Sequence, residues 1–327
     1  MNTQAPRKRV LVFRELPADQ LARIEARHDV THANPRVAAQ RAAFDAALPA
    51  TQAMIGSSFG IDAAMLDQAP ALEVISSISV GVDNYPIAEM RARGIVLCHT
   101  PGVLTETTAD TIFALVMATS RRLVELSNHI RDGHWTRNIG EDLFGSDVHG
   151  KTLGILGFGR IGQAVARRGG LGFGMPVLFH NRSRVDLHKE APDLLNVARQ
   201  LSFDDVLAGA DIVVVVLPLT PDTRDLIDTR AFGLMKPGAI FINGARGAIV
   251  CEPALLNALD HGTLRAAGLD VFATEPLPQD SPLRTHPKVT ALPHVGSATH
   301  ETRHAMAALA TTNLLAVLAG EKPPAAY

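Results

Sequence analysis

The chain has 327 residues, which at about 100–200 residues per domain predicts two domains. Hydrophobic residues make up 46% and charged residues 20%, an ordinary globular composition that excludes a disordered protein, a fibre and a coiled coil. The formal net charge of -2, from 31 basic and 33 acidic residues, argues against a nucleic-acid partner, because nucleic-acid-binding surfaces are basic.

The cysteine content and the apolar segments further narrow the class of protein. Cys98 and Cys251 are the only cysteines and form no C-x-x-C pair, which excludes a disulfide scaffold and a zinc ribbon, and no metal is expected. Both thiols are expected to be buried, in a reducing compartment. The run Val10–Phe13 is too short for a signal peptide, and Ile212–Leu219 is far short of the about 20 residues that cross a membrane. We therefore expect a cytoplasmic protein without a membrane partner.

Short apolar runs alternate with helical patterns along the chain, which is typical of βα units on a parallel sheet. The first set of expected elements comprises strands at Val10–Phe13, Ala53–Ile55, Val74–Ile78 and Ile95–Leu97 and helices at Ala18–Arg27 and Ile61–Gln68. The second set comprises strands at Leu153–Leu156, Val177–Phe179, Ile212–Leu217, Ala239–Ile242, Ala267–Val271 and Val289–Leu292. Their continuous apolar runs indicate strands buried on both faces.

Between the two sets lies the longest helical pattern of the chain. Apolar residues at helical spacing predict one helix over Thr105–Arg131, ending before Gly133. The polar stretch Gly133–Gly150, which contains Trp135, is expected to be a long connection. The tail Glu321–Tyr327, with two prolines, is expected to fray.

A glycine motif predicts a dinucleotide site. Gly157, Gly159 and Gly162 form G-x-G-x-x-G after a predicted strand and at the start of a helix. In this motif the first glycine permits a tight turn, the second lets the backbone approach a pyrophosphate, and the third permits close helix–strand packing. The helix N-terminus offers free N–H groups to the anion. We expect the helix to be distorted at its end, at Gly169–Gly170.

The end of the next strand indicates which dinucleotide binds. NAD-selective sites place an acidic residue there to bind the ribose 2′-OH. This chain has Asn181 instead, followed by Arg182, Ser183 and Arg184, which attract a 2′-phosphate. The sequence therefore predicts a preference for NADP(H), with NAD(H) as a second possibility.

Three later segments place polar residues after predicted strands: Arg246 in FINGARG, Asp270 and Glu275 in GLDVFATEPL, and His294 in ALPHVGSAT. Reduction of a 2-oxo acid needs such a set. A guanidinium binds the carboxylate and polarises the carbonyl, and an imidazolium donates a proton. A carboxylate beside the imidazole favours its charged form and fixes its tautomer.

With these motifs the chain resembles the D-isomer-specific 2-hydroxyacid dehydrogenase family over nearly its whole length. GFGRIG, N-x-A-R-G, GLDVFATEPL and PHVGSAT are the family's successive signatures, in order. The segments SSISVGVDNY, HTPGVLTETTADT, LFGSDVHGKTLGI and GSATHETR are most similar to bacterial glyoxylate/hydroxypyruvate reductases and 2-ketogluconate reductases.

The resemblance implies an α/β fold of two doubly wound parallel-sheet domains. A flavodoxin-like substrate-binding domain would comprise residues 1–102 and 295–327. A Rossmann NAD(P)-binding domain would be inserted in it at residues 103–294, with a dimerisation arm at about 105–150, which implies a homodimer.

The resemblance also implies the roles of individual residues. Arg246, Glu275 and His294 would be catalytic, with His294 as proton donor and Arg246 also binding the substrate. Val80, Gly81 and Ser297 would complete substrate binding. Cofactor-binding positions would be Gly157, Gly159, Arg160, Ile161, Gly162, Asn181, Arg182, Ser183, Leu217, Pro218, Thr223, Thr108, Asn243, Ala245, Asp270 and Gly296.

The predicted reaction is therefore NADPH-preferring reduction of hydroxypyruvate, glyoxylate or 2-ketogluconate to the D-2-hydroxy acid. Which 2-oxo acid is used stays open, since all three present the same carboxylate–carbonyl pair. One alternative is a nucleotide-sensing, corepressor-like binding protein of the same fold, which can retain the same three residues. Another is phosphite dehydrogenase, which needs an electropositive residue where Val80 stands.

Overall fold

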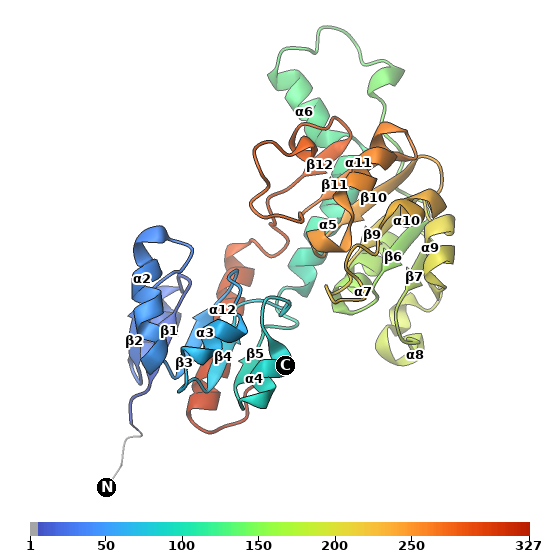
Figure 1. Cartoon of the computed structure of the whole chain (residues 1–327). Coiled ribbons are helices and arrows are strands. Elements are labelled where there is room, and N and C mark those ends of the chain that lie inside the picture. The colour runs from blue at the N-terminus through green and yellow to red at the C-terminus, as the bar shows by residue number, and fades with distance from the viewer. Residues whose placement is uncertain (1–5) are drawn as a thin grey trace. The chain divides into compact units, whose positions relative to one another are not determined.

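The computed structural model describes residues 6–327, and the chain divides into two compact units (Figure 1). One unit comprises Met1–Leu104 and Ala298–Tyr327, and the other comprises Thr105–Ser297. Each unit has its own all-parallel sheet with helices around it. The predicted fold class, two doubly wound parallel-sheet α/β domains, is confirmed.

The first unit is built on a five-stranded sheet in the order β2-β1-β3-β4-β5. Its strands are β1 (Arg9–Val12), β2 (Asp29–His32), β3 (Ala53–Gly56), β4 (Val74–Ser77) and β5 (Val96–Cys98). Its helices are α1 (Ala18–Glu25), α2 (Ala38–Ala47), α3 (Ala63–Asp67), α4 (Ile87–Ala92) and α12 (His300–Leu318). The Thr299 hydroxyl caps α12 by accepting from the Thr302 N–H at 3.2 Å, and α12 then packs against β3, β4 and β5.

The second unit has a seven-stranded sheet in the order β12-β11-β10-β9-β6-β7-β8. Its strands are β6 (Leu153–Leu156), β7 (Val177–His180), β8 (Ala198–Gln200), β9 (Ile212–Val215), β10 (Ala239–Asn243), β11 (Leu264–Leu269) and β12 (Val289–Ala291). Its helices are α5 (Thr105–Ser120), α6 (Leu123–Arg131), α7 (Arg160–Ala166), α8 (Leu187–Glu190), α9 (Phe203–Gly209), α10 (Thr229–Leu234) and α11 (Glu252–Asp260). The strand order reverses between β6 and β9, the point at which open α/β sheets bind ligands.

The single helix predicted over Thr105–Arg131 is wrong, because α5 ends at Ser120 and α6 begins at Leu123. Arg122 lies between them in the left-handed region, with φ of 55°. The Ser146 N–H donates to the Ser120 carbonyl at 2.7 Å and thereby satisfies the end of α5. A Cβ at Gly145 would lie 2.7 Å from that carbonyl oxygen, so only glycine permits this close approach. Figure 1 shows α6 extending away from the sheet of its unit.

The distortion expected at Gly169–Gly170 is confirmed. α7 ends at Ala166, and the chain continues as a π-helical turn over Arg167–Gly172. Both glycines are buried, and a Cβ at Gly169 would lie 2.6 Å from the side chain of Leu153. The wider turn therefore lets the end of the helix pack tightly against β6.

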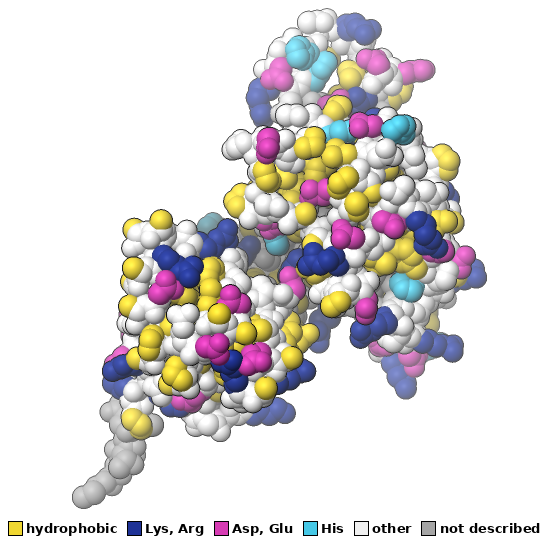
Figure 2. Space-filling view, in the orientation of Figure 1, with side chains coloured by type: hydrophobic (Ala, Val, Ile, Leu, Met, Phe, Trp, Pro, Cys, Tyr) yellow, Lys and Arg dark blue, Asp and Glu magenta, His cyan; other side chains and the backbone are white. Residues whose placement is uncertain are grey.

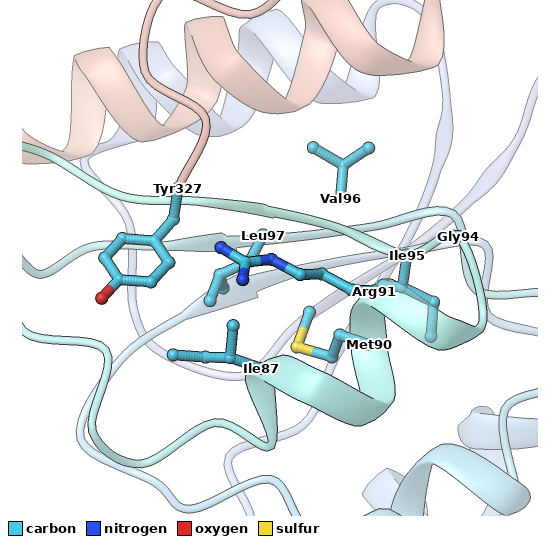
Figure 3. A pocket seen from close by; sticks show the side chains of 8 residues that line it. All are labelled: Ile87, Met90, Arg91, Gly94, Ile95, Val96, Leu97 and Tyr327. Carbon is cyan, nitrogen blue, oxygen red and sulfur yellow. The ribbon is translucent and has the colours of Figure 1, made fainter. Parts of the chain in front are cut away.

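The expected fraying of the C-terminal tail is wrong. The Tyr327 N–H donates to the Leu97 carbonyl at 2.9 Å, and the His99 N–H donates to the Ala325 carbonyl at 3.1 Å. The tail thus pairs antiparallel with the end of β5. Tyr327, α4 and β5 line a pocket of about 280 Å³, shown in Figure 3. None of the predicted site residues lines this pocket, and we assign it no role.

One face of the surface carries charges of both signs, and the two cysteines differ in exposure. On the face shown in Figure 2, acidic and basic side chains are interspersed. Cys98 is buried, but Cys251 is partly exposed, so the prediction of two buried thiols holds only for Cys98. Burial raises the pKa of the Cys98 thiol to about 11.

Within residues 6–327, no group of three or more His, Cys, Asp or Glu side chains is placed to hold a metal ion. In the same range, no helix has the length and apolarity needed to cross a membrane.

Candidate active site

The glycine loop joins β6 to α7 at the reversal of strand order. Gly157 has φ of 99°, a conformation open mainly to glycine, and its Cβ would lie 2.8 Å from the Val216 carbonyl oxygen. A Cβ at Gly162 would lie 2.1 Å from the Gly157 carbonyl oxygen, which requires glycine for the close packing of α7 on the loop. Around a Cβ at Gly159, by contrast, there is open space. The loop therefore fits a dinucleotide, with two glycines required by the fold and one facing free volume.

The segment after β7 is held beside this loop. The Asn181 side-chain oxygen accepts from the Phe158 N–H at 3.3 Å, and its amide donates to the Ser183 carbonyl at 3.2 Å. Gln200 on β8 also donates to the Ser183 carbonyl, at 2.9 Å. Arg182 and Arg184 are exposed, and neither forms an ion pair with any described acidic residue. Two arginines without an acidic partner among the described residues thus follow Asn181, the residue that contacts the glycine loop.

The turn after β9 supplies the next group of predicted cofactor residues. Thr223 fixes this turn, because its hydroxyl donates to the Pro218 carbonyl at 2.7 Å and accepts from the Thr220 N–H at 2.8 Å. Leu217 packs against the hydrophobic core and Pro218 is exposed. Arg160 and Ile161 begin α7 beside this turn. Since β9 neighbours β6, this turn lies at the same edge of the sheet as the glycine loop.

Asp270 follows β11 and is almost completely buried. Its two carboxylate oxygens accept from the N–H groups of Val295 and Gly296, at 2.7 and 2.8 Å. Burial raises the pKa of Asp270, and these two hydrogen bonds oppose that effect. A Cβ at Gly296 would lie 3.0 Å from Asp270 and 3.4 Å from Thr108. Asp270 therefore holds the loop that follows His294, a structural contact that the sequence did not predict.

Arg246 lies in a turn after β10, and hydrogen bonds from neighbouring residues fix the conformation of this turn. The buried Asn243 side chain accepts from the Ala245 N–H at 3.1 Å and donates to the Arg246 carbonyl at 3.0 Å. The Arg246 guanidinium donates to the Ala245 carbonyl at 2.9 Å. A Cβ at Gly247 would lie 1.8 Å from the Phe272 carbonyl carbon. Gly247 therefore lets the Arg246 turn pack directly on the segment that leads to Glu275.

Glu275 and His294 form a direct pair. The Nδ1 atom of His294 lies 2.7 Å from Oε2 of Glu275, and Oε1 accepts from the Phe272 N–H at 3.1 Å. Burial alone raises the pKa of Glu275, but the hydrogen bonds from His294 and Phe272 and the charges of His294 and Arg246 hold it below its ordinary value. The carboxylate is therefore ionised and accepts only, so Nδ1 of His294 is the donor. This leaves Nε2 to exchange a proton.

The structure thus brings Arg246, Glu275 and His294 together in the second unit, which also carries the glycine loop. His294 has φ of 54°, a strained conformation typical of functional sites. Ser297 is the last residue of this unit. Val80 and Gly81 belong to the first unit, in the loop after β4, where the Val80 carbonyl lies 3.2 Å from Nδ1 of His99. Their substrate role stays a prediction.

Two supporting residues were missed by the sequence reasoning. Gly247 permits the contact described above, and its place directly after Arg246 was the available signal. Glu252, at the start of α11, accepts from the Ala273 N–H at 2.8 Å and so fixes the loop that carries Glu275. No local motif marks Glu252, because its partner lies 21 residues away.

Comparison with known proteins identifies the class. Residues 113–296 match the family described as D-isomer specific 2-hydroxyacid dehydrogenase, NAD binding domain. The glyoxylate/hydroxypyruvate reductase B of Klebsiella pneumoniae (strain 342) is 48% identical over 314 residues, which cover 95% of each chain.

Comparison with solved structures supports the same family. The TT0316 protein from Thermus thermophilus superposes with a TM-score of 0.86 at 43% identity, covering 97% of this chain and 99% of that one. The NADPH-dependent glyoxylate/hydroxypyruvate reductase from Sinorhizobium meliloti, in complex with NADP and malonate, gives a TM-score of 0.87 at 31% identity, covering 98% and 97%. The chain belongs to the D-isomer specific 2-hydroxyacid dehydrogenase family. Members of this family are NAD(P)-dependent oxidoreductases.

Proposed function

We propose that this protein reduces a small 2-oxo acid, hydroxypyruvate or glyoxylate, to the D-2-hydroxy acid with NADPH as the preferred cofactor. The observation that carries the proposal is the His294–Glu275 pair, which shares a unit with Arg246 and with a glycine loop shaped for a dinucleotide. Relatives about 48% identical are named for this activity, which supports the substrate class. 2-Ketogluconate presents the same reactive end and belongs to the same proposal.

The bound reduced nicotinamide supplies the hydride. Arg246 binds the substrate carboxylate and polarises the carbonyl through its planar set of donors. His294 donates the proton on Nε2 to the carbonyl oxygen, so that C=O becomes CH–OH, and solvent then reprotonates the imidazole. Glu275 accepts from Nδ1 and stabilises the imidazolium before the transfer. General acid catalysis of this kind contributes about 10²–10⁴-fold to the rate.

Cofactor preference is assigned to the segment after β7. Arg182, with Arg184, binds the 2′-phosphate, and Asn181 and Ser183 supply hydrogen bonds. The support is that both arginines are exposed without an acidic partner among the described residues, while Asn181 contacts the glycine loop. Leu217, Pro218, Thr223 and Thr108 line the cofactor in this proposal, and Asp270 binds the nicotinamide carboxamide. Each oxygen of Asp270 retains accepting capacity beyond its one backbone hydrogen bond.

Three further assignments stay proposals. The N–H groups of Val80 and Gly81 bind the substrate carboxylate, the chain forms a homodimer, and the protein acts in the cytoplasm. The dimer has a physical motivation, since six apolar side chains in residues 123–144 are exposed. They are Leu123, Val124, Ile130, Trp135, Ile139 and Phe144. The apolar residues of α5, such as Ile112 and Leu115, are buried within their own unit instead.

The direct test follows the absorbance of NADPH after addition of hydroxypyruvate or glyoxylate, with the chirality of the product determined separately. We expect turnover and the D-product. A protein that binds NADPH tightly but turns over neither substrate would contradict the proposal and favour the nucleotide-sensing alternative.

A further inference from the structure

A group of arginines lies at the carboxyl edge of the first unit's sheet, outside the sites described above. β1 runs through Phe13 into Arg14, and β3 runs into Ser57 and Ser58. In the order β2-β1-β3-β4-β5, the reversal of strand order falls between β1 and β3. Arg14 and the two serines therefore flank the place where an open α/β sheet binds a ligand.

Arg14 and Arg36 both hold the loop after β3. One terminal nitrogen of Arg14, Nη1, donates to the hydroxyls of Ser57 and Ser58, the latter at 2.8 Å. Arg36 donates to the Ser58 carbonyl at 3.0 Å. Ser58 has φ of 62°, a strained conformation for a residue other than glycine. The N–H groups on Nε and Nη2 of Arg14 have no partner among residues 6–327, although a guanidinium carries five N–H donors.

The backbone beneath this group is continuous with the sheet. The Phe13 N–H donates to the Ile55 carbonyl at 3.0 Å and extends the pairing of β1 with β3. A Cβ at Gly56 would lie 2.5 Å from the Phe13 ring, so glycine at this position lets the two strand ends approach closely. Ser57 is itself buried. The positions of Arg14 and Ser57 are therefore set by the sheet and not by a mobile loop.

The charge of this group is uncompensated. Among the described residues, no acidic side chain forms an ion pair with Arg14 or Arg36. Burial, together with repulsion from Arg303 and Arg36, lowers the pKa of Arg14. Arg93 in the same unit shows the ordinary arrangement: Asp67 and Glu89 both bind it and raise its pKa. Partly buried positive charge at a strand end with free donors is suited to an anion.

We infer that Arg14, with Arg36 and Ser57, forms a subsite for a second anionic group of the substrate, a carboxylate or a phosphate distal to its 2-oxo acid end. This inference rests on the proposed role of Val80 and Gly81 in binding the first carboxylate. That loop follows β4, which is two strands from β1 in the same sheet, about 10 Å at the usual strand spacing. The Arg14 side chain extends from β1 toward the segment after β3, which lies between the two, and shortens this span toward the length of a 2-oxo acid of a few carbons.

The test compares kcat and KM for glyoxylate, hydroxypyruvate, 2-oxoglutarate and 3-phosphohydroxypyruvate in the wild type, Arg14→Gln, Arg36→Gln and Arg93→Gln. We expect the wild type to reduce at least one of the two substrates with a second anion. Arg14→Gln should raise KM for that substrate by about tenfold or more, the effect of one lost charge-assisted hydrogen bond. Glyoxylate, which has no second anion, should change by less than about threefold by the same argument. Arg36→Gln, at an exposed position, should act in the same direction but less, and Arg93→Gln should have no effect.

The outcomes separate this subsite from the proposed reaction. A rise in KM for 2-oxoglutarate alone in Arg14→Gln identifies the second anion as a carboxylate. A rise for 3-phosphohydroxypyruvate alone identifies it as a phosphate. An equal rise in KM for glyoxylate would make Arg14 a residue that only supports the fold. An unchanged KM for both dianions, or a wild type that reduces glyoxylate but neither dianion, would also overturn the inference. Calorimetric titration of the same two compounds gives a readout independent of turnover. If no substrate is reduced but Arg14→Gln still weakens binding by about tenfold, the proposed function fails and the subsite stands.

Discussion

Nδ1 of His294 lies 2.7 Å from Oε2 of Glu275, while Oε1 of the same carboxylate accepts the Phe272 N–H at 3.1 Å. Both oxygens of Glu275 are therefore engaged, and its carboxylate plane is fixed relative to the loop after β11. The imidazole is fixed in turn, with Nε2 left to transfer a proton. Glu275 is thus a positioning and charge-stabilising residue for His294.

Glu275→Gln should change the pH dependence of reduction. The pKa of Glu275 is lowered, so its carboxylate is negative through neutral pH and stabilises the imidazolium that reduction consumes. Without that charge, the imidazolium loses its proton more readily as pH rises. The basic limb of the kcat/KM profile should therefore move to lower pH. Glu252→Gln removes a carboxylate at the start of α11 that contacts the same loop but not His294, and it should leave the limb in place. Identical profiles for wild type and Glu275→Gln would contradict the assignment.

The glycine loop offers a matched pair of substitutions. Gly162→Ala places Cβ 2.1 Å from a backbone oxygen and should lower the free energy of unfolding by about 3 kcal/mol, the upper end of overpacking effects. Gly159→Ala places Cβ in open space and should change stability by less than about 1 kcal/mol. It should nevertheless weaken NADPH binding by roughly tenfold or more, because the methyl group occupies volume assigned to the pyrophosphate. Calorimetric melting and NADPH titration measure both effects, and unchanged NADPH affinity in Gly159→Ala would place the cofactor elsewhere.

Arg182→Ala should reduce the preference for NADPH. Loss of one charge-assisted hydrogen bond, about 1.5–3 kcal/mol, should lower kcat/KM for NADPH by about tenfold or more. NADH lacks the 2′-phosphate, so its kcat/KM should be nearly unchanged. Arg199→Ala, which removes another exposed arginine on the adjacent β8, is the control. Equal use of the two cofactors by the wild type would refute the assignment.

Assembly can be tested at the exposed apolar side chains of residues 123–144. Ile130 is 59% exposed and Trp135 60%, which a solvated surface does not favour. We predict a symmetric dimer with an interface above about 2,000 Å², as in obligate dimers. Ile130→Glu should shift it toward monomer in light scattering at micromolar concentration. Leu171→Glu alters a leucine that is 53% exposed and lies outside this segment, and it should leave the dimer intact. A monomeric wild type would contradict the prediction.

The sequence predicted those parts of the fold that leave a local apolar signal. The buried central strands β6 and β9 are continuous apolar runs and were found at nearly their observed bounds. The edge strands β2 and β8 were missed, because their sequences DVTH and ARQ are short and mostly polar. The break at Arg122 was missed for a different reason. It depends on a backbone hydrogen bond from Ser146, 26 residues after Ser120, and periodicity does not register such a contact.

For the candidate site, the sequence motifs predicted the catalytic residues but not the residues that hold their loops in position. His294 and Glu275 were paired in advance through the family resemblance, and the structure supplies their distance. The part played by Asp270 in holding Val295 and Gly296, and by Glu252 in holding Ala273, follows from contacts between segments distant in sequence. Arg14 lacked any signal, since an arginine after a first strand is ordinarily a solvated charge. The proposal for Arg14 depends on the structure, where its guanidinium binds Ser57 and Ser58 without an acidic partner among the described residues.

The measurement that bears most directly on the account is the single-turnover rate of hydroxypyruvate reduction by His294→Gln, compared with the wild type. His294→Gln retains a polar side chain near Glu275 but has no transferable proton. Single turnover observes the chemical step without product release. We predict a fall of about 10²–10⁴-fold in this rate, with the dissociation constant for NADPH nearly unchanged. A rate within a few-fold of the wild type would mean that another group or a water donates the proton, and the roles given to Arg246, Glu275 and His294 would fall together.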